Sequence, residues 1–192
     1  MLGSHAIAHL RGKRMEERSS GQLGNIMETL AVRFEPSSSR RWLAPILAGG
    51  ILAGAIDLIY AFLFYGAQGV APTRILQSIA SGLLGRAAYD SVFPAVPIGI
   101  GAHFFILIVA ASMYYAASRR LAFLRQRAYL SGMLFGVAIY CTMHYVVVPL
   151  SAAPHFKSTL MSFLSDFSVH VLLLGPAISL AVWFFDRAAT RR

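Results

Sequence analysis

The sequence predicts an all-α integral membrane protein, built as a four-helix bundle whose helices each cross a bilayer. Two observations on composition support this class: 57% of the 192 residues are hydrophobic and 13% are charged, and the mean hydropathy is +0.61. A soluble domain carries about a quarter charged residues. The third observation is that the apolar residues gather in four long runs. The composition excludes a disordered regulator, a collagen-like chain and a small disulfide scaffold, and it argues against a water-soluble enzyme.

The first part of the chain differs from the rest. Residues 1–39 contain many charged residues and no apolar stretch long enough to cross a bilayer. Such a segment cannot bury enough apolar surface to offset the entropy of ordering. We therefore predict a disordered, basic cytoplasmic tail over residues 1–39 and a transmembrane domain over residues 40–187. Residues 188–192 are predicted to form a short basic cytoplasmic C-terminus.

Four apolar runs have the length of about 20 residues that a helix needs to cross a bilayer. The predicted spans are residues 42–65, 96–117, 129–150 and 167–185. Aromatic residues mark their ends, as expected for side chains that prefer the membrane interface: Trp42, Tyr65, Tyr129 and Trp183. The pairs Gly50/Gly54 and Gly132/Gly136 have the spacing that lets two membrane helices approach closely.

The positive charges predict the orientation of these spans. Lys and Arg are counted in the segments that flank each span, because cytoplasmic flanks carry the excess. Fourteen lie before the first span, between the second and third, or after the fourth, and three lie in the other two loops. Both termini are therefore predicted to be cytoplasmic. The loops over residues 66–95 and 151–166 then lie on the outer side.

The first outer loop contains a predicted amphipathic helix between Pro72 and Gly85. Its apolar residues recur at helical spacing: Ile75, Leu76, Ile79, Ala80, Leu83 and Leu84. The opposite face collects Arg74, Gln77, Ser78 and Ser81. With one cation on its polar face, this helix is expected to pack as a lid on the bundle.

Each predicted span carries one ionisable residue that hydrocarbon would reject: Asp57, His103, His144 and His170. Such residues usually face the interior of a helix bundle. On the predicted topology all four lie in the outer half of the membrane. Tyr140 precedes His144 by one helical turn and Asp166 precedes His170 by one turn, so both could support the imidazoles from a second layer.

Three interpretations of this polar cluster remain open. The side chains could form hydrogen bonds between helices, or they could relay protons or ions. Alternatively, three imidazoles and a carboxylate suit Zn, Fe or Mn, and two facing imidazoles could ligate haem. No ligand motif of defined spacing is present, so no cofactor is assigned and the identity of any metal is unknown.

Other sites are not indicated. The sequence contains no nucleophile elbow, no phosphate-binding loop and no paired carboxylates within one span, so no catalytic residue is assigned. The net charge is +9, but the basic residues lie beside the apolar runs, and no basic groove with interleaved aromatic residues accompanies them. We therefore expect no nucleic-acid partner. The single cysteine, Cys141, cannot form an intrachain disulfide.

Three short segments carry a resemblance to known proteins: Gly101-Ala-His-Phe-Phe105, Tyr114-Tyr-Ala-Ala-Ser118 and Met143-His-Tyr-Val-Val-Val-Pro-Leu-Ser151. With the spans placed around them, residues 42–187 resemble a group of small, uncharacterised four-span inner-membrane proteins of proteobacteria, distantly similar to the YagU-like family. The resemblance implies a bacterial cytoplasmic membrane and no particular activity.

These observations predict an integral inner-membrane protein that is a non-enzymatic accessory or interaction protein. The alternative is a small metal-, haem- or proton-handling protein that uses the Asp/His cluster. The expected partners are the lipid bilayer and, as a homo-oligomer or a larger membrane complex, other membrane helices.

Overall fold

The structure is a computed structural model that describes residues 21–22, 41–154 and 159–190. The chain divides into two units, Met1–Arg41 and Trp42–Arg192. The first unit is described only at residues 21, 22 and 41, so the predicted disordered tail lies almost wholly outside the described residues. Every regular element in the described part of the chain is helical, which confirms the all-α class.

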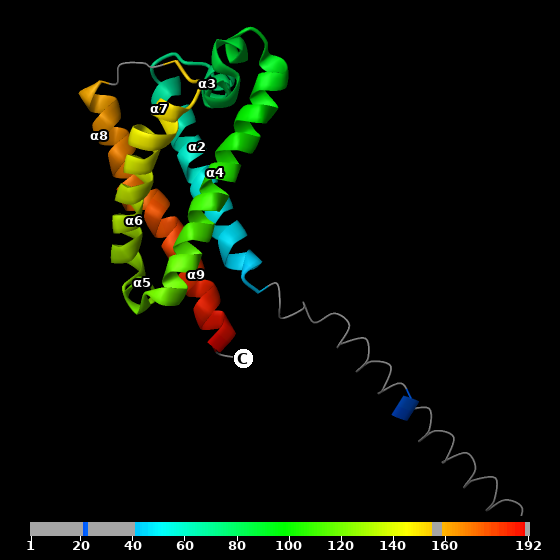
Figure 1. Cartoon of the computed structure of the whole chain (residues 1–192), viewed down its shortest axis with the longest axis vertical. Helices are drawn as coiled ribbons and strands as arrows, with labels where there is room; N and C mark the ends of the chain where they lie inside the picture. The colour runs from blue at the N-terminus through cyan, green and yellow to red at the C-terminus, as the bar shows by residue number, and fades with distance from the viewer. Residues whose placement is uncertain (1–20, 23–40, 155–158, 191–192) are drawn as a thin grey trace, which may run out of the picture. The chain divides into compact units, whose positions relative to one another are not determined.

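Four helices of the second unit are long and apolar enough to cross a membrane, as predicted. The first span is α2 (Leu43–Gly66) and the second is α4 (Val92–Arg120). The third joins α6 (Ala128–Thr142), the π-helical turn η3 (Met143–Val147) and α7 (Val148–Leu150). The fourth joins α8 (Leu160–Val169), the π-helical turn η4 (His170–Leu174) and α9 (Gly175–Thr190). Consecutive spans run in opposite directions (Figure 1).

Shorter elements lie at the two ends of this bundle. Helix α3 (Pro72–Leu84) and the 3-10 turn η2 (Gly85–Tyr89) connect the first span to the second. Helix α5 (Ala122–Gln126) connects the second span to the third. These connections lie at opposite ends of the bundle, which are called the α3 end and the α5 end below (Figure 1).

The second span begins earlier than the sequence predicts, at Val92 instead of residue 96. Phe93 has an extended backbone, with φ −109° and ψ 126°, so the regular helix starts at Pro94. Pro97 has no N–H to donate to the carbonyl of Phe93. The hydroxyl of Ser91 donates to that carbonyl instead, which is how the first helical turn accommodates the proline.

The fourth span also begins earlier, at Leu160 instead of Phe167. Thr159 caps it, because its side-chain oxygen accepts a hydrogen bond from the Ser162 N–H at 3.2 Å. Inside this helix the hydroxyl of Ser168 donates to the carbonyl of Leu164 at 2.7 Å. The hydroxyls of Ser162 and Ser168, two polar residues that interrupt the hydropathy pattern, are thus satisfied by backbone carbonyls of the same segment.

Glycines bring the backbones of neighbouring spans into contact. A Cβ atom added at Gly136 would lie 2.1 Å from the His170 carbonyl oxygen, and one at Gly175 would lie 2.0 Å from the Gly132 carbonyl oxygen. On the other side of the bundle, a Cβ at Gly50 would lie 2.8 Å from the Cα of Ile108. Both predicted glycine pairs therefore lie at close contacts between helices.

Helix α3 packs on the beginning of α4. A Cβ atom at Gly99 would lie 2.2 Å from the Leu76 carbonyl oxygen, so the glycine allows this approach. Two residues that the sequence assigns to the polar outer face, Gln77 and Ser81, are buried in the structure. Burial is tolerated because the Gln77 amide donates to the carbonyl of Ser91 at 3.2 Å and Ser81 bonds within its own helix.

Each π-helical turn ends two residues before a proline, η3 before Pro149 and η4 before Pro176. The N–H of the residue after each turn bonds five residues back, Val148 to Met143 and Gly175 to His170. A proline ring clashes with the carbonyl four residues earlier, and a widened turn is one way to accommodate it. Both turns contain a histidine of the predicted polar cluster, His144 in η3 and His170 in η4.

Candidate functional site

Asp57 of α2 and His103 of α4 face each other in the half of the bundle next to α3. Gly54, one turn before Asp57, has no side chain that would separate the helices, since a Cβ there would lie 2.7 Å from the Phe104 ring. The Nε2–H of His103 donates to the Gly54 carbonyl at 2.9 Å. Its Nδ1 then points to Asp57, 4.0 Å from Oδ2.

The two partners differ in burial. The side chain of His103 is 7% exposed and that of Asp57 is 22% exposed. The separation of 4.0 Å is too long for a direct hydrogen bond. Because the Nε2–H donates to a carbonyl, Nδ1 is the nitrogen of His103 that faces Asp57.

His170 approaches from the fourth span. Its Nδ1–H donates to the backbone carbonyl of Asp166 at 2.7 Å, so its Nε2 has no partner within the described residues. The imidazole lies within electrostatic range of Asp57, as does His103. The predicted residues of the second and fourth spans, His103 and His170, therefore both lie within electrostatic range of Asp57 of the first span.

Asp166 has a different role from the predicted one. The structure uses its backbone carbonyl, not its carboxylate, to orient His170. The carboxylate accepts hydrogen bonds from two phenols of α2, Tyr60 at 2.6 Å and Tyr65 at 3.2 Å. This contact ties the fourth span to the first near the α3 end.

His144 stands apart from the other three. Its ring stacks on Tyr140 one turn earlier, with centroids 4.1 Å apart, which is the neighbour expected from the spacing. Tyr140 in turn contacts the edges of Phe163, Phe167 and His170. The Tyr140 hydroxyl and the Nδ1 of His144 are both buried without a hydrogen-bond partner in the described part of the chain. His144 and His170 thus both pack on the Tyr140 ring.

The sequence does not identify Tyr60 and Tyr65 as members of this polar region. It predicts Tyr65 as an interface anchor because this residue ends the first apolar run. The sequence feature that could have indicated them is that Asp166 and these two tyrosines all fall near the same end of antiparallel spans.

Within residues 41–154 and 159–190, no three His, Cys, Asp or Glu side chains gather closely enough to hold a metal ion.

Comparison with known proteins adds no relative to this picture. No family model, no curated protein and no solved structure matches the chain. The resemblance to the YagU-like family therefore stays a prediction from three short segments.

Proposed function

We propose that the chain is a multi-pass protein of the bacterial inner membrane, with both termini in the cytoplasm and the α3 end outside. Four helices of sufficient length and apolarity support the membrane assignment. The charge asymmetry of fourteen to three supports the orientation. In this orientation α3 is an amphipathic helix that lies over the outer mouth of the bundle.

Alkaline phosphatase fusions test the orientation, because this enzyme is active only on the outer side of the bacterial inner membrane. Fusions after Gly69 or after residue 157 should be active, and fusions after Gln126 or after residue 192 should be inactive. A cytoplasmic reporter fused at the same positions serves as the matched control and should give the opposite pattern. The reverse result for both reporters would overturn the orientation and would place the polar region in the inner half of the membrane.

We further propose that the protein is a non-enzymatic accessory component that accepts and releases protons through its intramembrane Asp/His cluster. The observation that carries the proposal is the pair Asp57 and His103, held 4.0 Å apart by the anchored imidazole. Ionisable groups inside a membrane usually mark proton or ion pathways. The Asp57 carboxylate can exchange a proton with the neighbouring His103 imidazole, and the His170 imidazole lies within electrostatic range of the same carboxylate.

The arrangement favours proton exchange because only one nitrogen of each imidazole is occupied. The Nε2–H of His103 donates a hydrogen bond to the Gly54 carbonyl, and the Nδ1–H of His170 donates one to the Asp166 carbonyl. Each ring can therefore gain or lose a proton at its other nitrogen without rotating. When an imidazole gains that proton, the Asp57 carboxylate stabilises the resulting cation, since opposite charges attract strongly away from water.

Infrared difference spectroscopy between two pH values above about 5 tests this proposal in reconstituted protein, because solvent-exposed carboxyl groups stay ionised in that range. A carboxyl group that gains a proton shows the carbonyl stretch of a carboxylic acid, and the wild type should show this band as pH falls. Asp57→Asn should remove the band. His103→Gln should move the pH at which the band appears, because Gln keeps a polar side chain but cannot become a cation. Asp90→Asn, at an exposed turn, should leave the band unchanged.

The competing interpretation is that the cluster only holds the helices together. In that case Asp57→Asn and His103→Gln would lower stability in detergent and leave the infrared band untouched. Two results would overturn the proton-handling proposal. The first is a band that is still present in Asp57→Asn, and the second is a band whose pH dependence is the same in His103→Gln as in the wild type.

A further inference from the structure

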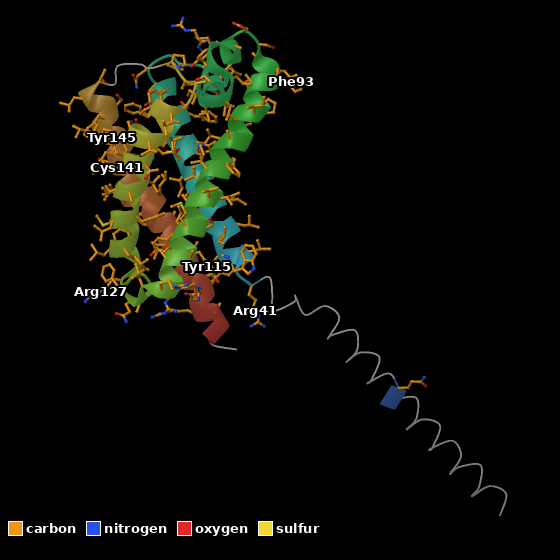
Figure 2. The ribbon with its side chains drawn as sticks, viewed as in Figure 1. Arg41, Phe93, Tyr115, Arg127, Cys141 and Tyr145 are labelled. Atoms are coloured by element: carbon orange, nitrogen blue, oxygen red, sulfur yellow. The ribbon has the colours of Figure 1, made fainter. Side chains whose placement is uncertain are left out.

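The α5 end of the bundle carries a strongly positive surface. In the described residues of the second unit, one carboxylate, Asp186, accompanies five arginines at this end: Arg119, Arg120, Arg125, Arg127 and Arg187. Arg119 pairs with Asp186 and lies over the Tyr115 ring, 4.4 Å from its centroid. Figure 2 shows Tyr115 and Arg127 at this end and Phe93 at the opposite end.

Three of these arginines remain available to an outside partner. Arg120, Arg125 and Arg127 are exposed, and none has an ion-pair partner in the part of the chain that the structure describes. They flank or belong to α5, the short connection between the second and third spans. We call these three residues the α5 arginines.

The segment that carries the α5 arginines is fixed to the bundle by buried hydrogen bonds. The carbonyl of Leu124, in the middle of α5, accepts from the Tyr114 hydroxyl at 2.9 Å and from the Ser131 hydroxyl at 3.1 Å. Tyr114 and Ser131 are both 1% exposed. Because the backbone of α5 is held in this way, binding a partner costs less ordering entropy than it would on a free loop.

The α5 arginines alternate with exposed apolar side chains. Leu121 is 57% exposed, Phe123 is 45% exposed and Tyr129 is 52% exposed. Apolar groups beside guanidinium groups, at the point where membrane-spanning helices end, match the layer in which acyl chains meet headgroup phosphates. A nucleic acid would offer no apolar layer for Leu121 and Phe123.

We propose that the α5 arginines bind the phosphate of an anionic phospholipid. Guanidinium groups donate paired N–H bonds to phosphate oxygens, and Leu121 and Phe123 would contact the glycerol and upper acyl region of the same lipid. A juxtamembrane arginine is worth about 1 kcal/mol, roughly a fivefold preference, toward an anionic membrane surface. This proposal rests on the proposed membrane location of the chain. It does not depend on the proposed proton function, because the site lies at the other end of the bundle.

The two tryptophans of the chain provide an internal reporter for this site. Trp42 begins the first span and Trp183 lies near the end of the fourth, so both are at the α5 end. Lipids with brominated acyl chains quench the fluorescence of tryptophans that they touch. In vesicles of phosphatidylcholine, brominated phosphatidylglycerol should quench more strongly than brominated phosphatidylcholine at equal mole fraction, with a relative binding constant of at least about five. Added salt should reduce the preference.

Variants locate the binding surface. The triple variant Arg120→Gln/Arg125→Gln/Arg127→Gln should lose the preference, so that both lipids quench equally. The matched variant Arg74→Gln/Arg86→Gln, at the α3 end, should keep it. Circular dichroism and thermal unfolding in detergent should be unchanged in both, since the replaced side chains are exposed.

Three results would overturn the proposal. Equal quenching of the wild type by both lipids would show that there is no anionic-lipid site. A preference retained by the triple variant would place the site elsewhere. Loss of the preference on adding millimolar inorganic phosphate at constant ionic strength would show that the arginines bind free phosphate in preference to a lipid headgroup.

Discussion

Replacing Gly175 by alanine should destabilise the bundle by about 3 kcal/mol, the upper part of the range for an overpacked core. The added Cβ would lie 2.0 Å from the Gly132 carbonyl oxygen and 2.5 Å from the Gly136 nitrogen. These are backbone atoms, so no side-chain rotation relieves the clash and the third and fourth spans must separate. Unfolding by sodium dodecyl sulfate in mixed micelles, followed by circular dichroism, measures the loss.

Gly101→Ala is the matched control for this substitution. Gly101 lies in the second span, and nothing lies within 4 Å of a Cβ added there. Alanine favours a helix over glycine by about 1 kcal/mol, so this variant should be as stable as the wild type or slightly more stable. Equal behaviour of the two variants would mean that the third and fourth spans do not touch at Gly175.

The second large effect is expected at Asp166, whose carboxylate joins the fourth span to the first. Asp166→Ala leaves the hydroxyls of Tyr60 and Tyr65 without their acceptor. Hydrogen bonds between membrane helices average about 0.6 kcal/mol, and those to a charged group are roughly twice as strong, so losing both should cost about 2 kcal/mol. Asp166→Asn keeps one acceptor oxygen and should cost less than half as much. The same detergent unfolding experiment measures both variants.

A double-mutant cycle identifies the partner. If Tyr60 donates to Asp166, Asp166→Ala should cost less in a Tyr60→Phe background than in the wild type, because the bond is already absent. Tyr89→Phe, on the turn that follows α3, is a tyrosine with no contact to Asp166 and should leave the cost of Asp166→Ala unchanged. Full additivity of Asp166→Ala and Tyr60→Phe would show that the two side chains are not bonded.

The sequence predicts the four spans because each is a long apolar run, and hydrocarbon requires that length. It misplaces the beginnings of two of them for local reasons. Pro94 and Pro97 look like turn residues, yet Ser91 satisfies the carbonyl that Pro97 leaves open. In the same way, the polar residues before Phe167 look like a loop, although the Thr159 cap starts a helix there. A hydropathy pattern gives no information about these hydrogen bonds.

The polar region was predictable in part. One ionisable residue per span at a similar depth is visible in the sequence, and the structure brings Asp57, His103 and His170 together. The partners of Asp166 were not predictable, because spacing within one helix suggested His170, whereas the carboxylate reaches across to Tyr60. Contacts between spans depend on helix rotation, which a single sequence leaves undetermined.

The π-helical turn η4 sets the rotation of the fourth span. In an uninterrupted α-helix, Ile178 would lie about 120° around the axis from Asp166, since each residue turns the chain by about 100°. The extra residue in the widened turn cancels about 100° of this offset. As a result Asp166 meets Tyr60 and Ile178 meets Gly49, both on α2, along a single line of contact. Without the turn, one of these two side chains would point away from α2.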